Sequence, residues 1–261
     1  MHRKIPVEVN VSRRKCLGAG LAIVTAAAGA VGCSMLQKSK PSVSATTIPW
    51  PYAEFDVEAV RRRGYEYKYE KACMYGVVKA IAVTAAEQNP YPWSTLPFDA
   101  FSYGRGGAYS WGTLCGALNG GLLVLTLALG DCPQAADDLM TWYMKTPLPS
   151  LKHEQYCRFR SQPLVVPGSP LCHQSVGAWI KTSGKNVHTP ERIERCAKLS
   201  GDTAAYVAEI LNRARQGGYK PAALPPDPVN DCLGCHFGPK TERDDTISKM
   251  QCLDCHEDHR T

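Results

Sequence analysis

The chain has 261 residues, a formal net charge of +6 and 12 cysteines. Residues 1–33 carry five Lys or Arg and one Glu, which leaves the rest of the chain with a net charge of only about +2. This small charge, with no basic stripe along the sequence, argues against a nucleic-acid partner.

The N-terminal 33 residues are typical of a twin-arginine export signal. Arg13-Arg14 precede an uncharged, apolar stretch of 16 residues that runs from Leu17 to Gly32. This stretch is shorter than a membrane span, although an N-terminal anchor helix is the alternative. Cys33 follows Ala30-Val31-Gly32, which resembles a lipoprotein cleavage box, so Cys33 is a candidate for a lipid anchor. We therefore expect a periplasmic protein, with residues 34–55 as a tether.

The central part of the chain, residues 56–218, predicts a helical body and an all-α fold. No stretch alternates with a period of two, as a half-buried strand would. The apolar segment over 112–129 has only about ten uninterrupted apolar residues, which predicts a buried helix and not a membrane span. Helices are expected over 56–88, ending at Asn89-Pro90, over 133–145 and 171–181, and from Pro190 to Gly217-Gly218.

Residues 219–261 predict a linker followed by a short, mostly irregular segment that binds two haems. The segment contains two C-x-x-C-H runs, the attachment signal of c-type haem, in which two thiols bind the porphyrin and the histidine binds iron. The attachment residues are Cys232, Cys235, Cys252 and Cys255, and the proximal iron ligands are His236 and His256. A zinc site made by the same four cysteines is the alternative, but it gives the two histidines no role.

Six further cysteines remain in the body. In an exported protein they could form three disulfides. Four of them lie on segments that predict different helices, and four inward thiolates could instead hold an iron–sulfur cluster. Those four are Cys73, Cys115, Cys172 and Cys196. Cys132 and Cys157 are left over, and we expect them to form a disulfide or, as the alternative, to be free.

The same cysteines carry a resemblance to known families. Cys73, the run from Cys115 to Gly120, Cys172 and Cys196 resemble the pattern of the C…GCAxxG…C…C family of redox proteins. With the two C-x-x-C-H runs added, the chain resembles the family of split-Soret cytochromes c. That resemblance implies a homodimer with two c haems per subunit, and an iron–sulfur centre held by the four body cysteines.

The second axial ligand of each haem decides its chemistry, since a histidine gives a low-potential carrier and an open position gives a binding site. Histidine ligation of both irons is expected. The distal candidates are His173 and His188, then His153 and His259, with Met250 as the methionine candidate.

These features together predict an electron carrier that works with other redox proteins. No Ser-His-Asp set, paired carboxylates or nucleotide-binding loop indicates an enzyme. The alternatives are a haem-dependent reductase of small molecules with one open axial position, and a zinc-stabilised interaction module.

Overall fold

A computed structural model describes residues 47–225, 229–237, 246 and 248–259 of the chain. Within these residues all regular elements are helices, and pairing between extended segments is limited to two isolated bridges. The all-α prediction is therefore confirmed. The export signal, Cys33 and most of the predicted tether lie outside the described residues.

The first two helices, α1 (Val57–Glu70) and α2 (Cys73–Gln88), pack against each other. The single helix predicted over 56–88 is wrong, because the backbone leaves helical geometry at Lys71. The break lets α2 fold back across α1, so that each helix buries its apolar face on the other. A Cβ atom added to Gly76 would lie 2.8 Å from a backbone nitrogen of α1, which shows how closely the two helices approach.

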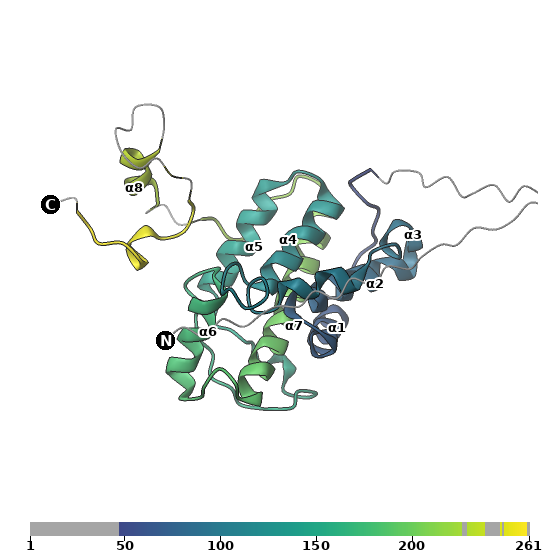
Figure 1. Cartoon of the computed structure of the whole chain (residues 1–261). Coiled ribbons are helices and arrows are strands. Elements are labelled where there is room, and N and C mark those ends of the chain that lie inside the picture. The colour runs from purple at the N-terminus through teal and green to yellow at the C-terminus, as the bar shows by residue number, and fades with distance from the viewer. Residues whose placement is uncertain (1–46, 226–228, 238–245, 247, 260–261) are drawn as a thin grey trace, which may run out of the picture. The chain divides into compact units, whose positions relative to one another are not determined.

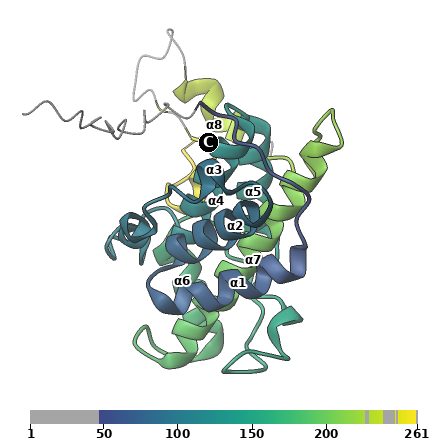
Figure 2. The ribbon, with the colours of Figure 1, turned by 90° about the vertical axis from the view of Figure 1, so that its right-hand side faces the viewer.

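The body is built around α7, the longest helix, against which α1, α2, α4 and α5 all pack (Figure 1, Figure 2). The elements that follow α2 are, in chain order, α3 (Pro90–Trp93), η1 (Phe98–Gly104), α4 (Gly116–Leu129), α5 (Pro133–Lys145), η2 (Leu151–His153), α6 (Cys172–Ser183), α7 (Pro190–Arg215), α8 (Val229–His236) and η3 (Cys252–Asp254). The predicted ends of the helices over 56–88 and 133–145 are confirmed, because α2 ends at Gln88 and α5 at Lys145.

The apolar segment of α4 is a core helix, as predicted. Leu118 and Val124 on α4 are fully buried against α2, α5 and α7. No helix among the described residues is long and apolar enough to cross a bilayer.

Part of the predicted tether belongs to the body. Trp50 is 7% exposed and Phe55 is 4% exposed, and both join the main core. The backbone N–H of Trp50 donates to the carbonyl of Leu127 at 2.7 Å, and the indole of Trp93 donates to the carbonyl of Pro51 at 2.7 Å. The aromatic side chains explain the correction, since burying each of them stabilises the folded state by about 2 kcal/mol or more.

Asp138 on α5 is a buried carboxylate that holds the segment following α7. It accepts hydrogen bonds from the hydroxyls of Tyr206 and Tyr219, at 2.8 and 2.5 Å, and from the guanidinium of Arg213 at 2.7 Å. Two consecutive backbone N–H groups of the linker also donate to it, at 3.1 and 2.8 Å. Burial acts to raise the pKa of Asp138, but these hydrogen bonds, led by that of Tyr219, lower it overall. The start of the C-terminal segment is therefore attached to the body by a charged anchor.

Replacing this anchor by Asp138→Asn should lower the free energy of unfolding in urea by about 2–3 kcal/mol near neutral pH, because the donors lose their charged acceptor. Since the folded-state pKa is depressed, the carboxylate stabilises the fold fully above its unfolded pKa of about 4 and loses this effect as the pH falls through the folded pKa. The difference in the free energy of unfolding between the unmodified protein and the Asp138→Asn variant should therefore become smaller in acid. Asp137→Asn, one residue earlier, is the control, and equal losses for both variants would contradict the anchor.

Candidate metal and cofactor sites

Three of the four predicted cluster cysteines stand where a helix begins. Cys73 is the first residue of α2, Cys172 is the first residue of α6, and Cys115 immediately precedes α4. Cys196 lies inside α7 and is 6% exposed. The expectation that Cys73 and Cys115 lie within helices is thus wrong, because both stand at the N-terminus of a helix. There, free backbone N–H groups and the helix dipole favour a thiolate.

Close backbone contacts bring these helix starts together. A Cβ added to Gly116 would lie 1.9 Å from the carbonyl oxygen of Gly104, so that only glycine fits directly after Cys115. The backbone N–H of Cys115 donates to the carbonyl of Pro170 at 2.9 Å, and that of Cys172 donates to the carbonyl of Thr113 at 2.7 Å. The loop before α4 and the loop before α6 are therefore paired, each next to its cysteine.

The four thiols influence one another's ionisation. Cys73 hydrogen-bonds to Cys196, which lowers the pKa of Cys196 well below its ordinary value despite burial. The same hydrogen bond, with burial, raises the pKa of Cys73 well above its ordinary value. Burial, followed by the charges of Cys115 and Cys196, raises the pKa of Cys172 to about 12, and burial raises that of Cys115. Cys196 is therefore the thiol of the four that loses its proton most readily.

Three basic side chains act electrostatically on the thiol of Cys196. The charges of Arg195, Lys68 and Arg192 all act to lower the pKa of Cys196. Arg195 is 1% exposed, and Lys68 is 9% exposed with its ammonium donating to the carbonyl of Ile193 at 2.8 Å. Burial lowers the pKa of Lys68, while the charges of Cys73 and Cys196 act to raise it. These cations therefore stabilise negative charge on the sulfur of Cys196.

This set of donors fits an iron–sulfur cluster better than a single metal ion. Among the described residues, no three His, Cys, Asp or Glu side chains are arranged to hold one metal ion. An iron–sulfur cluster makes a different demand, because its iron and sulfide atoms stand between the thiolates. Four mutually interacting thiols with three neighbouring cations match the chemistry of that group.

Cys132 and Cys157 do not form the expected disulfide, since both are free. Cys132 precedes α5, and its thiol lies 3.9 Å from the side-chain oxygen of Gln134. The thiol of Cys157 lies 4.0 Å from a carboxylate oxygen of Glu154. Each cysteine belongs to a different local turn, which explains why the pairing prediction is wrong.

The two C-x-x-C-H runs lie next to each other in the C-terminal segment. The first forms the end of α8 and the second begins with η3. Cys232 hydrogen-bonds to Cys252, and burial together with the charge of Cys232 raises the pKa of Cys252. The rings of His236 and His259 are perpendicular, with 5.6 Å between their centroids. His259, which follows the second run, therefore lies beside His236 of the first run.

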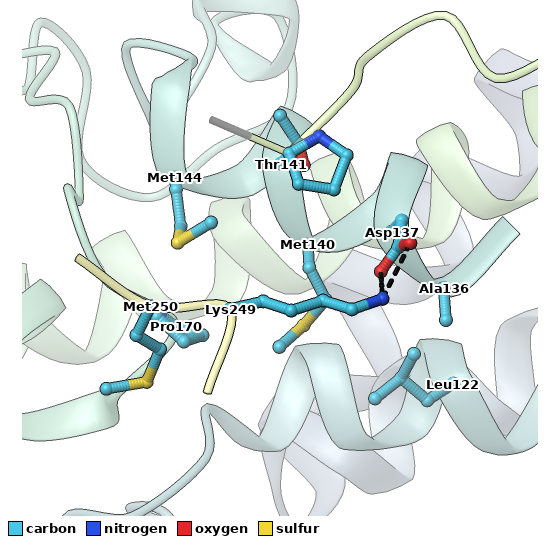
Figure 3. Close-up of a pocket in the computed structure, with 10 residues that line it drawn as sticks. Leu122, Ala136, Asp137, Met140, Thr141, Met144, Pro170, Lys249 and Met250 are labelled. Atoms are coloured by element: carbon cyan, nitrogen blue, oxygen red, sulfur yellow. Dashed lines mark hydrogen bonds and ion pairs between the residues drawn. The ribbon is translucent and has the colours of Figure 1, made fainter. Parts of the chain in front are cut away.

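Contacts with α5 and α6 bring the second run to the body. The side-chain amide of Gln174 donates to the sulfur of Cys255 at 3.3 Å, and the ammonium of Lys249 pairs with Asp137 at 2.7 and 2.8 Å. Figure 3 shows this ion pair beside a cavity of about 210 Å³, lined mainly by apolar side chains that include Met140 and Met250. The second run thus lies close to the start of α6, where one cysteine of the cluster site is found.

The four distal candidates differ in their surroundings. The Nδ1 atom of His173 donates to the carbonyl of Gly112 at 2.9 Å, an arrangement that leaves the lone pair on Nε2 for a metal. His153 is fully buried, with Nε2 against Asp202 at 3.0 Å and Nδ1 against Tyr156 at 2.9 Å. Neither nitrogen of His153 is therefore available to iron, because the core has enclosed a residue that the sequence placed in an irregular stretch.

His188 is exposed in the connection between α6 and α7. The 12 residues of α6 span about 18 Å, and His173 stands at one end of this helix while His188 follows the other end. His188 is therefore remote from the contact between Gln174 and Cys255.

Sequence reasoning missed three residues beside the thiols, which are Tyr143, Ser175 and Arg195. Tyr143 hydrogen-bonds to Cys115, and Arg195 hydrogen-bonds to Cys196. The only signal in the sequence is the position of Arg195 next to Cys196, since the other two come from separate helices.

The chain is similar to known redox proteins. A family model described as "Putative redox-active protein (C_GCAxxG_C_C)" matches residues 72–210, which include all four cysteines. The split-Soret cytochrome c of Desulfovibrio desulfuricans is 30% identical over 199 residues, which are 74% of this chain and 71% of that protein. A solved structure of a split-Soret cytochrome c from that organism, described as having a novel iron centre, is similar with a TM-score of 0.73 and 27% identity, over 80% of this chain and 90% of that one.

This chain departs from the family pattern around Cys115. The pattern has a glycine before its second cysteine, whereas here Leu114 precedes Cys115 and Gly116 follows it. The close approach of the Gly104 carbonyl leaves no space for a side chain at this position, which explains the glycine.

We expect Gly116→Ala to lower the free energy of unfolding by about 3 kcal/mol, because the new Cβ would meet a backbone carbonyl that cannot rotate away. Urea unfolding measures this loss. The control is Gly177→Ala on α6, where nothing lies within 4 Å of the added Cβ and where alanine should stabilise the helix by up to about 1 kcal/mol. Equal stability of the two variants would refute the close contact.

Proposed function

The chain belongs to the family of split-Soret cytochromes c and, through its body, to the C…GCAxxG…C…C family of redox-active proteins, and from this we propose that it is a haem-containing electron-transfer protein. When bound, haem c and an iron–sulfur cluster each take up and release single electrons. The protein supplies their ligands, their spacing and the charges around them.

The observation that carries this proposal is the contact between the second C-x-x-C-H run and the start of α6. Gln174 touches Cys255, and the two residues before Gln174 are His173 and Cys172. A haem on Cys252 and Cys255 would thus lie near a residue that can bind iron and near a cysteine of the cluster site. This proximity favours transfer of an electron between the two centres.

In the complete proposal each chain binds two c haems. Cys232 and Cys235 hold the first and Cys252 and Cys255 hold the second, with His236 and His256 as proximal ligands. The four body cysteines, Cys73, Cys115, Cys172 and Cys196, hold an iron–sulfur cluster. The fit of their charges and of the neighbouring cations to thiolate ligands supports this assignment.

For the distal positions we assign His173 to the haem of the second run and His259 to the haem of the first. The contact of Gln174 with Cys255 supports His173, and the ring of His259 beside His236 supports the other assignment. Histidine on both sides of each iron gives a six-coordinate carrier and leaves no position for a substrate.

The site of action in this proposal is the periplasm, reached by the twin-arginine route, with a lipid on Cys33 as a further anchor. This route carries folded proteins, which suits insertion of a cluster before export and attachment of haem afterwards. The protein would act as a homodimer that exchanges electrons with other redox proteins.

The composition of the purified protein tests the cofactor assignment. We expect pyridine haemochrome spectra to give two haems per chain, and iron analysis on anaerobic protein to give more than two irons together with acid-labile sulfide. Replacing the four body cysteines by serine should remove the sulfide and the additional iron and leave both haems. A count of two irons per chain would leave only the haems, and colourless protein would remove the basis of the proposed function.

The assignment of His173 predicts that His173→Ala converts one of the two haems from low spin to high spin, because one axial position opens. Visible and EPR spectra measure this change. His188→Ala is the matched control and should leave both haems low spin. Unchanged spectra for His173→Ala would exclude this ligand, and binding of carbon monoxide by the unmodified protein would favour the reductase alternative.

A further inference from the structure

Three buried side chains from three helices form a hydrogen-bonded chain behind the thiols. The guanidinium of Arg195 on α7 donates through Nη2 to the hydroxyl of Ser175 on α6 at 2.7 Å. The hydroxyl of Ser175 is 2.8 Å from that of Tyr143 on α5. Tyr143 is fully buried, and Ser175 and Arg195 are each 1% exposed. Such a chain is costly to bury unless both of its ends meet partners.

Both ends of this chain reach cysteines of the cluster site. The hydroxyl of Tyr143 hydrogen-bonds to Cys115, which acts against the effect of burial on the pKa of that thiol. Arg195 hydrogen-bonds to Cys196 at the other end. When the hydroxyl of Tyr143 donates to the sulfur of Cys115, its oxygen accepts from Ser175, whose own oxygen accepts from Arg195.

The charge of Arg195 has no carboxylate partner. In the described part of the chain Arg195 forms no ion pair with Asp or Glu, while the neighbouring Glu194 accepts hydrogen bonds from Tyr65 and Tyr69. Its hydrogen-bond partners are the neutral hydroxyl of Ser175 and the thiol of Cys196, so a balancing negative charge would have to come from the cysteine site.

One donor of Arg195 is left unused. Its Nε atom is buried and has no hydrogen-bond partner among the described atoms. Buried N–H groups nearly always have an acceptor, and an unsatisfied one costs about 1–3 kcal/mol. An additional acceptor beside Cys196 would remove this cost, and the sulfide or thiolate of a cluster is such an acceptor.

We propose that Arg195, Ser175 and Tyr143 form an outer hydrogen-bonding shell that raises the reduction potential of the cluster held by the four body cysteines. This inference rests on the proposed cluster and adds the residues that regulate it. Cluster potentials depend on net charge and on hydrogen bonds to the sulfurs. One added electron makes the site more negative by one charge, and a fixed guanidinium with aligned donors stabilises that state more than the oxidised one.

The choice of arginine suits this role. A guanidinium remains charged at all pH values that the protein experiences and presents several N–H donors in a fixed plane. One donor serves Ser175, while Nε is left for a further acceptor. Lysine would retain the charge but not this division of donors.

A redox titration of the anaerobic holoprotein tests the proposal, with the cluster followed by EPR so that haem absorption does not interfere. Arg195→Met removes the charge and the donors, and Tyr143→Phe removes only the hydroxyl that serves Cys115. We expect the equilibrium constant for reduction of the cluster to fall at least tenfold in Arg195→Met, a shift of about 59 mV for one electron. A smaller shift in the same direction is expected for Tyr143→Phe and for Arg195→Lys.

The matched controls are Tyr206→Phe and Arg213→Met, which remove a tyrosine hydroxyl and a guanidinium that bind Asp138 and not a cysteine. Their cluster potentials should equal that of the unmodified protein. Unchanged reduction potentials of the cluster in both Arg195→Met and Tyr143→Phe, with iron content retained, would contradict the proposed effect of the outer shell. If Arg195→Met fails to fold, the comparison of Tyr143→Phe with Tyr206→Phe decides the question. Absence of sulfide from the unmodified protein would instead overturn the cluster itself.

Discussion

The cysteine site depends on one close contact between two stretches of backbone. The carbonyl of Gly104 occupies the space that a side chain at position 116 would need. Because residue 116 has no side chain, α4 can begin directly after Cys115 while lying against the end of η1. α2, which begins at Cys73, packs against both of these elements. A side chain at this point would separate two of the four thiols.

Charge balance is the second constraint on the site. Buried thiols are costly to ionise by themselves, and at Cys196 the charges of Arg195, Lys68 and Arg192 offset this cost. The hydrogen bond with Cys73 is the largest effect that lowers the pKa of Cys196. Binding of iron would replace the remaining thiol protons, which couples the filling of the site to proton release.

The C-terminal segment depends on the body for its position. It has few apolar side chains of its own, so that burial alone cannot organise it. Its beginning is anchored on Asp138, and its second C-x-x-C-H run is held near the body by Lys249 and Gln174. These polar contacts lead the second run towards α6, the helix that begins with Cys172 and His173, and so relate the two kinds of redox site proposed for the chain.

The sequence by itself determined the features that depend on neighbouring residues. Helical periodicity and the predicted ends of the helices over 56–88 and 133–145 located most helices, and the C-x-x-C-H spacing predicts the haem attachment residues, because both signals are contained in a few consecutive positions. Only the tertiary structure decided what depends on distant segments. The break at Lys71, the burial of His153 and the chain from Arg195 to Tyr143 all arise where helices far apart in sequence pack together. Such packing leaves no local pattern, since its partners are chosen by shape and charge in the folded molecule.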